Sequence, residues 1–250
     1  METPLVSIIL PLFNSEKYLT ETIDSIVNQT YTNWELIITD DFSTDKGYDL
    51  AKFHSERDKR IFLYKLNKNS GAGFARNNSI KYSKGRFIAF CDSDDQWKPN
   101  KLEIQVSFMT KNKYDFTCSG FDVIDEAGKF IETTHPPMKL TFNKLLINNY
   151  VGCLTAIYDT KSLGKIYMSS IRNRQDWVLW LGILNKIKIA YTINEPLAIY
   201  RKRSGSISSN KIKMIRFHWR VYYEELNFGF LRSIFCLSNN MLFHFIKKYN

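Results

Sequence analysis

Short apolar runs alternate with segments of helical periodicity through residues 6–91. The apolar runs predict buried strands over residues 6–10, 34–39, 61–65 and 87–91. Between the first two runs, Leu19, Ile23 and Ile26 recur at helical spacing, and Asn14 or Ser15 is expected to cap this helix. Strands that alternate with helices predict βαβ units. The expected fold class is therefore α/β, with a mainly parallel sheet flanked by helices.

The net charge of +10 is concentrated in the last fifth of the chain. Residues 201–250 hold ten lysines and arginines against two glutamates, a balance of +8. A basic segment of this kind favours contact with phosphates or with an anionic surface. The 250 residues are enough for one large α/β domain, or for a core domain with an appendage.

The cysteines and the N-terminal residues favour a cytosolic protein. The four cysteines are widely spaced without a CxxC pair, so we expect neither a disulfide framework nor a zinc site. The first apolar run is broken by Pro11 and follows no basic region, which argues against a signal peptide. No apolar stretch reaches the roughly 18–20 residues that a membrane-spanning helix needs.

Polar residues follow three of the predicted strands: Asn14 the first, Asp40 and Asp41 the second, and the segment 92–95 a later one. Because parallel sheets bind ligands beyond the carboxyl ends of their strands, these residues are expected to meet in one crevice. The alternative for Asp40 and Asp41 is an Asx turn that only closes the strand.

The segment 92–95 holds three carboxylates, Asp92, Asp94 and Asp95. Ionised together in a partly buried place, they repel one another and need a cation or must take up a proton. Carboxylate oxygens suit a divalent metal, which is often shared with a phosphate. The alternative is a solvated turn that is rich in aspartate.

The second half of the chain is less regular. A helix is expected after Pro99, a shorter helix over residues 176–184, and strands over residues 116–121, 153–158 and 187–193. Residues 211–223 mix basic and aromatic side chains at helical spacing, which is typical of helices at a membrane interface. The alternative is that this tail packs on the rest of the chain.

Several motifs in a fixed order resemble the family 2 glycosyltransferases, which have the GT-A fold and use nucleotide sugars. They lie at residues 6–14, 25–31, 35–45, 71–77, 85–95 and 174–181. The resemblance covers roughly residues 4–208 and is nearest to bacterial enzymes that assemble O-antigen, capsule or teichuronic-acid polysaccharides. It implies a catalytic domain over residues 1–208, with a nucleotide-binding half (1–98) and an acceptor-binding half (99–208). The basic helical tail would then be residues 209–250.

The resemblance also implies roles for single residues. Pro11, Phe13 and Asn14 would line the nucleoside, and Asp41 would accept a hydrogen bond from the imide N–H of uracil. Arg76 would face the nucleotide or its diphosphate, although a solvated charge on a helix is the alternative.

In the acidic segment, the resemblance implies that Asp94 binds Mn²⁺ or Mg²⁺. Asp92 would contact the ribose or the metal with its water shell. Ser93 and Asp95 would lie near the donor, Asp95 beside its sugar.

Asp176 matches the catalytic carboxylate of the family and would act as the base in a single displacement with inversion, although a helix N-cap is a second use of this residue. Two positions depart from the family pattern. Gln175 stands where many relatives have Glu, and Arg203 stands where many have His. Arg203 cannot bind a metal, but it can pair with a diphosphate.

The implied enzyme moves a hexose or N-acetylhexosamine from a UDP-sugar to a lipid-diphosphate-linked glycan. It would act as a peripheral protein on the cytoplasmic face of the bacterial inner membrane, with its tail on the membrane surface and no nucleic-acid partner. One alternative is a nucleotidyltransferase, which would need a glycine-rich basic loop after the first strand, and residues 11–14 form no such loop. The other is a non-catalytic glycan-binding or membrane scaffold protein, which would be indifferent to Asp176→Asn.

Overall fold

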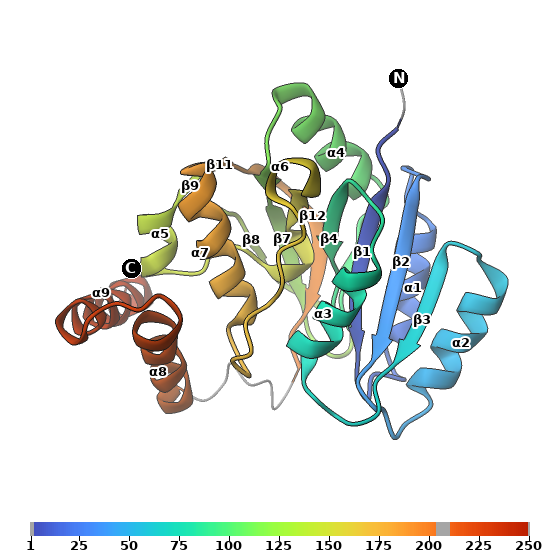
Figure 1. The fold of residues 1–250 in the computed structure, drawn as a ribbon, viewed down its shortest axis with the longest axis horizontal. Helices are drawn as coiled ribbons and strands as arrows, with labels where there is room; N and C mark the ends of the chain where they lie inside the picture. Colours follow the sequence, from blue (N-terminus) through green and yellow to red (C-terminus); the bar gives the residue numbers. More distant parts are fainter. Residues whose placement is uncertain (1–2, 204–210, 250) are drawn as a thin grey trace.

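A central six-stranded sheet organises the protein, and the computed structural model describes residues 3–203 and 211–249 (Figure 1). Its strand order is β3-β2-β1-β4-β10-β6. The strands are β1 (Val6–Leu12), β2 (Trp34–Asp40), β3 (Ile61–Lys65), β4 (Phe87–Phe90), β6 (Phe116–Thr117) and β10 (Ile157–Asp159). The first four run parallel, whereas β10 is antiparallel to both of its neighbours. The expected mainly parallel sheet is thus confirmed.

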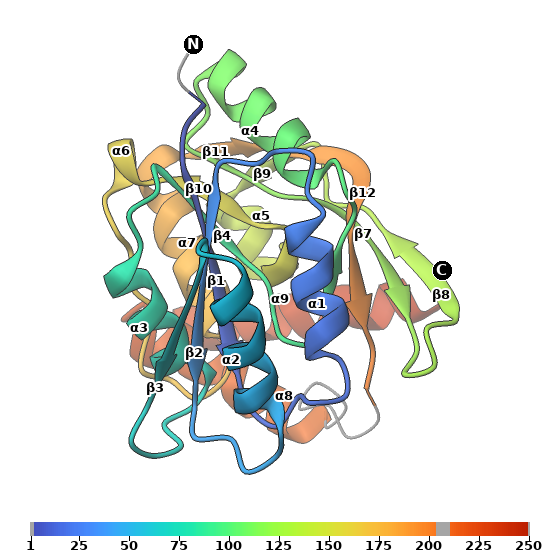
Figure 2. The same cartoon turned by 90° about the vertical axis from the view of Figure 1, so that its right-hand side faces the viewer.

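Helices cover both faces of this sheet, as Figure 2 shows. They are α1 (Leu19–Val27), α2 (Gly47–Arg57), α3 (Ala72–Tyr82) and α4 (Lys101–Asn112). Every residue of β1 is buried, and alternate residues face opposite sides. Ile8 packs in one core with side chains of α1, α2 and α4, and Ile9 packs in the other with side chains of α3.

The second half of the chain adds two smaller sheets beside the large one. A four-stranded sheet has the order β5-β12-β7-β8, and β11 pairs with β9. These strands are β5 (Gln96–Trp97), β7 (Ser119–Ile124), β8 (Phe130–Thr134), β9 (Lys139–Thr141), β11 (Ile189–Tyr191) and β12 (Ile193–Arg201). The helices of this half are α5 (Phe142–Ile147), the 3₁₀ turn η1 (Cys153–Thr155), α6 (Thr160–Leu163) and α7 (Gln175–Ile187).

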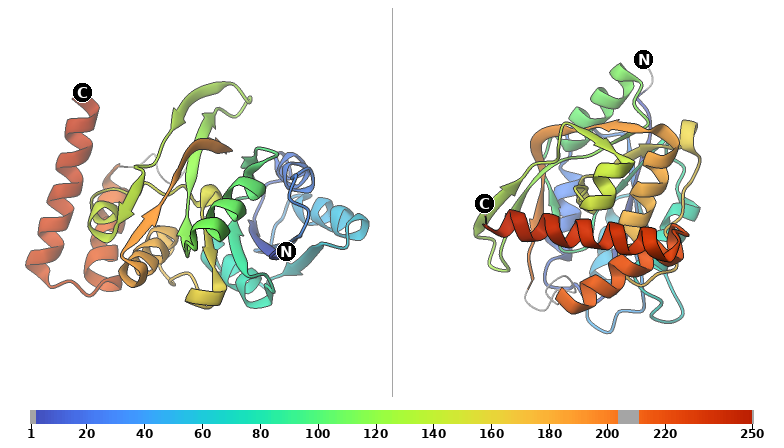
Figure 3. Two further views of the ribbon diagram at one scale, coloured as in Figure 1. Left: turned by 90° about the horizontal axis from the view of Figure 1, so that it is seen from above. Right: turned by 90° about the vertical axis from the view of Figure 1, so that its left-hand side faces the viewer.

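Three helical segments of the tail lie beside α5 and α7, on the side away from α2 (Figure 3). They are α8 (Lys211–Arg220), the π-helical turn η3 (Val221–Glu225) and the long helix α9 (Phe230–Tyr249). The expected boundary between residues 208 and 209 falls outside the described residues. Among the residues that the structure describes, no helix is both long and apolar enough to cross a membrane.

The structure corrects the start of the first helix and the end of the first strand. Helix α1 begins at Leu19 rather than after Asn14 or Ser15, whose side chains bond to other segments of the chain. Strand β1 continues through Pro11. Pro11 has no N–H to donate to a neighbouring strand. Its nitrogen lies on the same side of β1 as the carbonyl of Ile9, which faces β4. Because β4 ends beside Ile9, no strand hydrogen bond is lost at Pro11.

Further corrections concern the second half. Helix α4 begins two residues after Pro99, with Asn100 at its N-cap. The strand expected over residues 116–121 is two strands in different sheets. The one expected over residues 153–158 is half 3₁₀ turn, and the one expected over 187–193 is interrupted and continues as β12 to Arg201.

Candidate active site

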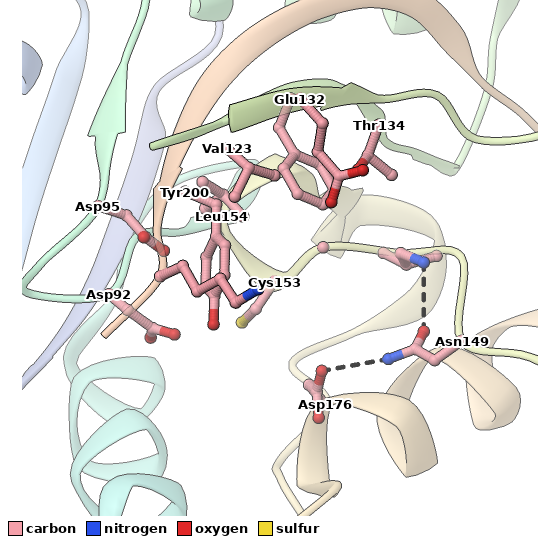
Figure 4. Close-up of a pocket in the computed structure, with 14 residues that line it drawn as sticks. Asp92, Asp95, Val123, Glu132, Thr134, Asn149, Cys153, Leu154, Asp176 and Tyr200 are labelled. Atoms are coloured by element: carbon pink, nitrogen blue, oxygen red, sulfur yellow. Dashed lines mark hydrogen bonds between the residues drawn. The ribbon is translucent and has the colours of Figure 1, made fainter. Parts of the chain in front are cut away.

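Two cavities meet at Asp92, beyond the carboxyl ends of β1, β2 and β4. The first, which we call the β1 cavity, has a volume of about 350 Å³. Its lining includes Pro11, Phe13, Asp41, Arg76, Asp92, Ser93, Asp94 and Arg203. The second, the β7 cavity, has a volume of about 450 Å³ and includes Asp92, Asp95, Phe121, Asn149, Cys153, Asp176 and Tyr200 (Figure 4). Both volumes are in the range of small-molecule sites, roughly 300–1,000 Å³.

Asp41 is buried and lines the β1 cavity. Its two carboxylate oxygens accept hydrogen bonds from the backbone N–H groups of Ser70 and Gly71, each at 2.7 Å. Gly71 has a φ of +97°, a conformation that favours glycine. Asp41 therefore fixes the turn that starts α3, and it is more than an Asx turn at a strand end. Each oxygen keeps a second lone pair for a ligand.

Arg76 projects from α3 into the same cavity and is only 8% exposed, so it is not a solvated helix charge. Its Nη2 donates to Oδ1 of Asp92. Burial opposes the charge of the guanidinium, but Asp92, Cys153 and Asp176 together outweigh burial and raise the pKa of Arg76 above its ordinary value. The buried Nε of Arg76 has no hydrogen-bond partner among the described residues. This donor can serve an anionic ligand.

The acidic segment is held in place from several sides. Arg203 Nη1 lies 3.2 Å from Asp94 Oδ2, and the backbone N–H of Arg201 donates to Asp95 at 3.0 Å. The hydroxyl of Ser93 donates to that of Ser15 at 2.8 Å.

The same segment favours positive charge. Burial raises the pKa of Asp94, and the charge of Asp92 raises it further, whereas Arg203 opposes both. Burial also raises the pKa of Asp95, helped by Asp94 and Asp92. Within residues 3–203 and 211–249, no three His, Cys, Asp or Glu side chains form a complete metal site. A metal here would need ligands from a bound molecule as well.

Two residues expected at the donor site, Asn14 and Asp95, do not line the β1 cavity. Asn14 lies outside both cavities with a φ of +46°, and its Oδ1 accepts a hydrogen bond from the N–H of Thr44 at 2.9 Å. The side chain of Asn14 thus joins the loop after β1 to the loop after β2. Asp95 lines the β7 cavity and not the β1 cavity.

Asp176 lies in the first turn of α7 and faces the β7 cavity. The N-cap of this helix is Arg174, with a φ of +66°, so the N-cap reading of Asp176 is wrong. Asn149 Nδ2 lies 3.4 Å from Asp176 Oδ2. Figure 4 shows this pair on one side of the cavity and Asp92 with Asp95 on the other. A bound group can therefore contact carboxylates on opposite sides.

Several residues of the β7 cavity were not expected from the sequence, among them Glu132, Asn149, Cys153 and Tyr200. Burial, with added effects of Asp95, Asp94 and Asp92, raises the pKa of Tyr200 to about 12, so its hydroxyl keeps its proton and can donate. The available signal was weak. Tyr200 lies three residues before Arg203, on a strand that the sequence did not reveal.

Comparison with known proteins adds to this geometry. The family model described as "Glycosyl transferase family 2" matches residues 7–165. TuaG of Bacillus subtilis, described as a teichuronic acid biosynthesis glycosyltransferase, is 41% identical over 237 residues, 93% of each chain. WfgD of Escherichia coli, described as a UDP-Glc:α-D-GlcNAc-diphosphoundecaprenol β-1,3-glucosyltransferase, is 41% identical over 88% of this chain and 86% of its own.

Solved structures share the fold at low sequence identity. The crystal structure of S. aureus TarS 1-349 in complex with UDP-GlcNAc has a TM-score of 0.70 at 20% identity, covering 96% of this chain and 72% of that one. A mannosyltransferase from Pyrobaculum calidifontis, solved with GDP-Man and Mn²⁺, has a TM-score of 0.64 at 14% identity, covering 96% and 74%. The expected GT-A architecture is thus confirmed.

Proposed function

Because the chain belongs to glycosyl transferase family 2, we propose that it transfers a hexose or N-acetylhexosamine from a UDP-sugar to a lipid-diphosphate-linked glycan. The product would be a bacterial surface polysaccharide. One observation carries the proposal: a cavity with carboxylates and arginines meets, at Asp92, a second cavity that presents Asp176. The name of WfgD supports this class of donor and acceptor, and the name of TuaG supports a polysaccharide product.

The β1 cavity would bind the nucleotide. Pro11 and the exposed ring of Phe13 would contact the nucleoside, and Asp41 would accept the imide N–H of uracil through a free lone pair. Arg76 and Arg203 would face the diphosphate. The unpartnered Nε of Arg76 supports this assignment, since a buried donor without an acceptor is costly and a phosphate oxygen would satisfy it.

Asp94 and Asp92 would hold Mn²⁺ or Mg²⁺. The two side chains fit such a metal because they supply oxygen ligands. Burial and the charge of Asp92 raise the pKa of Asp94, which means that they disfavour its ionised form, and a bound cation would favour that form. When bound, the metal would neutralise charge on the departing nucleoside diphosphate.

Asp176 would accept the proton of the acceptor hydroxyl. The hydroxyl oxygen then forms a bond to the anomeric carbon while the bond from that carbon to the UDP oxygen breaks. Attack comes from the face opposite the leaving group, so the configuration inverts. Asp95 and the protonated Tyr200 line the same cavity and would contact the donor sugar. A glycosidase needs a second carboxyl as an acid, which this mechanism does not.

A transfer assay tests the proposed function. The probes are UDP-glucose and a GlcNAc-α-diphosphate on an undecyl chain, with Mn²⁺. We expect a disaccharide product, with inverted configuration by NMR. Asp176→Asn should lower kcat about 10²–10⁴-fold and leave UDP binding unchanged, since it removes the base but spares the β1 cavity. Equal turnover by wild type and Asp176→Asn would contradict the role of Asp176 as the base. Release of pyrophosphate from UTP and glucose 1-phosphate would instead favour a nucleotidyltransferase.

We also propose that α9 lies on an anionic membrane surface on the cytoplasmic face. Its solvent side carries large apolar side chains that are 41–81% exposed, namely Phe230, Leu231, Ile234, Phe235, Met241, Leu242, Phe245 and Ile246. These residues lie in the basic last fifth of the chain, and the proposed acceptor is lipid-linked. An apolar face beside basic residues is typical of helices in a membrane interface.

Vesicle flotation tests the membrane contact. Vesicles of phosphatidylglycerol and phosphatidylethanolamine should float wild type, with less bound protein at high salt. Leu242→Glu with Phe245→Glu should release the protein into the soluble fraction. The matched control is Phe53→Glu, on the distant helix α2, where the ring is also half exposed. Equal flotation of all three proteins would contradict this contact.

A further inference from the structure

The carboxyl end of α5 is held by the tail. A helix end leaves its last carbonyls without helical partners. Here three consecutive carbonyls, at residues 145, 146 and 147, accept bonds from the side chains of three other elements. Trp177 Nε1 of α7 donates at 2.8 Å, Tyr222 Oη of η3 at 2.6 Å, and Asn240 Nδ2 of α9 at 2.6 Å. All three donors belong to buried residues.

This anchored end leads directly to the β7 cavity. The chain leaves α5 in an extended conformation at residue 148, and Asn149 follows. The Oδ1 of Asn149 accepts the backbone N–H of Val151 at 3.2 Å, which fixes the orientation of the amide because only its oxygen can accept. The Nδ2 must then point toward Asp176, as Figure 4 shows.

The other side of this contact rests on the same tail residues. Trp177, the neighbour of Asp176 in α7, packs edge-on against Tyr222 at a ring distance of 5.6 Å and against His218 at 5.0 Å. Asn149 and Asp176 are therefore both supported by side chains from the tail. Their relative position depends on how the tail packs.

We propose that Tyr222 and Asn240 are positioning residues for Asp176. By holding the end of α5, they hold Asn149 against one carboxylate oxygen of Asp176 and leave the other oxygen for the acceptor hydroxyl. The tail is then part of the catalytic unit as well as a membrane contact. This inference rests on the proposed role of Asp176 as the base.

Kinetics of Tyr222→Phe, Asn149→Ala and the double variant test the link, with the transfer assay described above. Each single variant should lower kcat about tenfold and leave the Kd of UDP unchanged, because the β1 cavity is not touched. The double variant should be no worse than Asn149→Ala, since both changes act through one contact. The matched control, Tyr223→Phe on the exposed neighbour, should behave as wild type.

Hydrogen exchange in the same proteins measures, without an activity assay, whether the tail holds residues 148–151 in place. The amides of residues 148–151 should exchange faster in Tyr222→Phe and at the wild-type rate in Tyr223→Phe. Losses in kcat that multiply in the double variant, or unchanged exchange at these amides in Tyr222→Phe, would overturn the inference. Absence of transfer by wild type would instead overturn the proposed function, while the exchange result would still decide whether the tail holds this segment.

Discussion

At the scale of single residues, the acidic segment already has partners of opposite charge. Asp92 pairs with the buried Arg76, and Asp94 with the more exposed Arg203. When a diphosphate and a metal bind together, these side chains can change partners. The arginines would then contact the phosphates, and the carboxylates would contact the metal. Metal and nucleotide binding should therefore support each other.

Arg203→Ala separates the two ligands. The positive charge of Arg203 stabilises the carboxylate of Asp94 and competes with a cation for it. Without Arg203 this competition is gone, so Mn²⁺ alone should bind several-fold more tightly. UDP alone should bind about two- to fivefold more weakly, the size expected for one half-exposed charge pair. Calorimetric titration with each ligand separately measures both effects. A fall in both affinities would show that Arg203 only supports the structure.

Lys101 is an internal charge without a hydrogen-bond partner. It is fully buried, its Nζ lies 4.0 Å from the centre of the Trp97 ring, and no acceptor for it is found in the described parts of the chain. Burial lowers the pKa of Lys101 to about 7, against smaller opposing effects of Cys91 and Cys118.

Lys101→Met should therefore raise the free energy of unfolding, by about 1–3 kcal/mol at pH 7. Between pH 7 and pH 10.5 the unfolded wild type binds more protons than the folded protein, so wild-type stability rises with pH over this window. The advantage of the variant should shrink as pH rises. Chemical denaturation at pH 7 and pH 9.5 measures it, and an advantage that grows with pH would refute the assignment.

Which site residues the sequence could reveal depended on where they lie. Asp41 and Asp92 directly follow strands with strong apolar patterns, so their meeting could be predicted from the rule for parallel sheets. Arg76 could be placed only through its family motif, and its burial was not foreseen. Asn149 lies on irregular chain after a short helix and Cys153 begins a 3₁₀ turn, and no periodicity marks either position. The role of each predicted residue stays a prediction.

At the scale of elements, helices α3 and α7 meet at Gly73. A Cβ built on Gly73 would lie 2.6 Å from the side-chain nitrogen of Gln175, which is itself buried. Because α3 carries Arg76 and α7 carries Asp176, this close contact sets the distance between the proposed diphosphate and base positions.

Gly73→Ala should therefore push the amide of Gln175 aside and lower kcat about threefold, because the new methyl group meets the end of a side chain and not the backbone of α7. The double variant Gly73→Ala with Gln175→Ala should recover much of the loss, because it opens the space that the new methyl group needs. The transfer assay compares both with Gln175→Ala alone. If the double variant is as slow as Gly73→Ala, the amide of Gln175 is not what the methyl group displaces.

Elements with strong local patterns were predicted well, and those that depend on distant partners were not. The strand at residues 61–65 has the predicted bounds. Strand β12 was not predicted beyond Ile193 because it contains Pro196, which is unusual inside a strand. The pairing with β7 shifts in register around Pro196, and no local sequence pattern indicates such a shift. The segment 153–158 changes from 3₁₀ turn to strand only because β4 and β6 pair with its second part.

At the scale of the whole molecule, the tail is joined to the catalytic body by buried polar groups. His218 lies in this joint, against Trp177. Burial lowers the pKa of His218 to about 4, and Arg174 lowers it further, whereas Asn240 opposes them. The folded protein therefore keeps this histidine neutral.

Acid should weaken the joint. Below pH 6.5 the unfolded chain takes up a proton on this histidine, whereas the folded protein does not. The contribution of His218 to the free energy of unfolding is therefore fully present above pH 6.5 and is lost as pH falls toward 4. His218→Gln should remove about 1–3 kcal/mol of this loss. Unfolding free energies of both proteins at pH 7 and pH 4.5 measure the difference. Parallel losses in the two proteins would place the acid sensitivity elsewhere.

In the proposed function, the β1 cavity binds uridine diphosphate while Asp176 acts from the β7 cavity. Calorimetric titration with UDP, GDP, CDP and dTDP in the presence of Mn²⁺ tests it most directly. We predict that UDP binds most tightly, that Asp94→Ala weakens this binding at least tenfold, and that Asp176→Asn leaves it unchanged. Equal binding of GDP, or no binding of any nucleotide, would contradict the assignment.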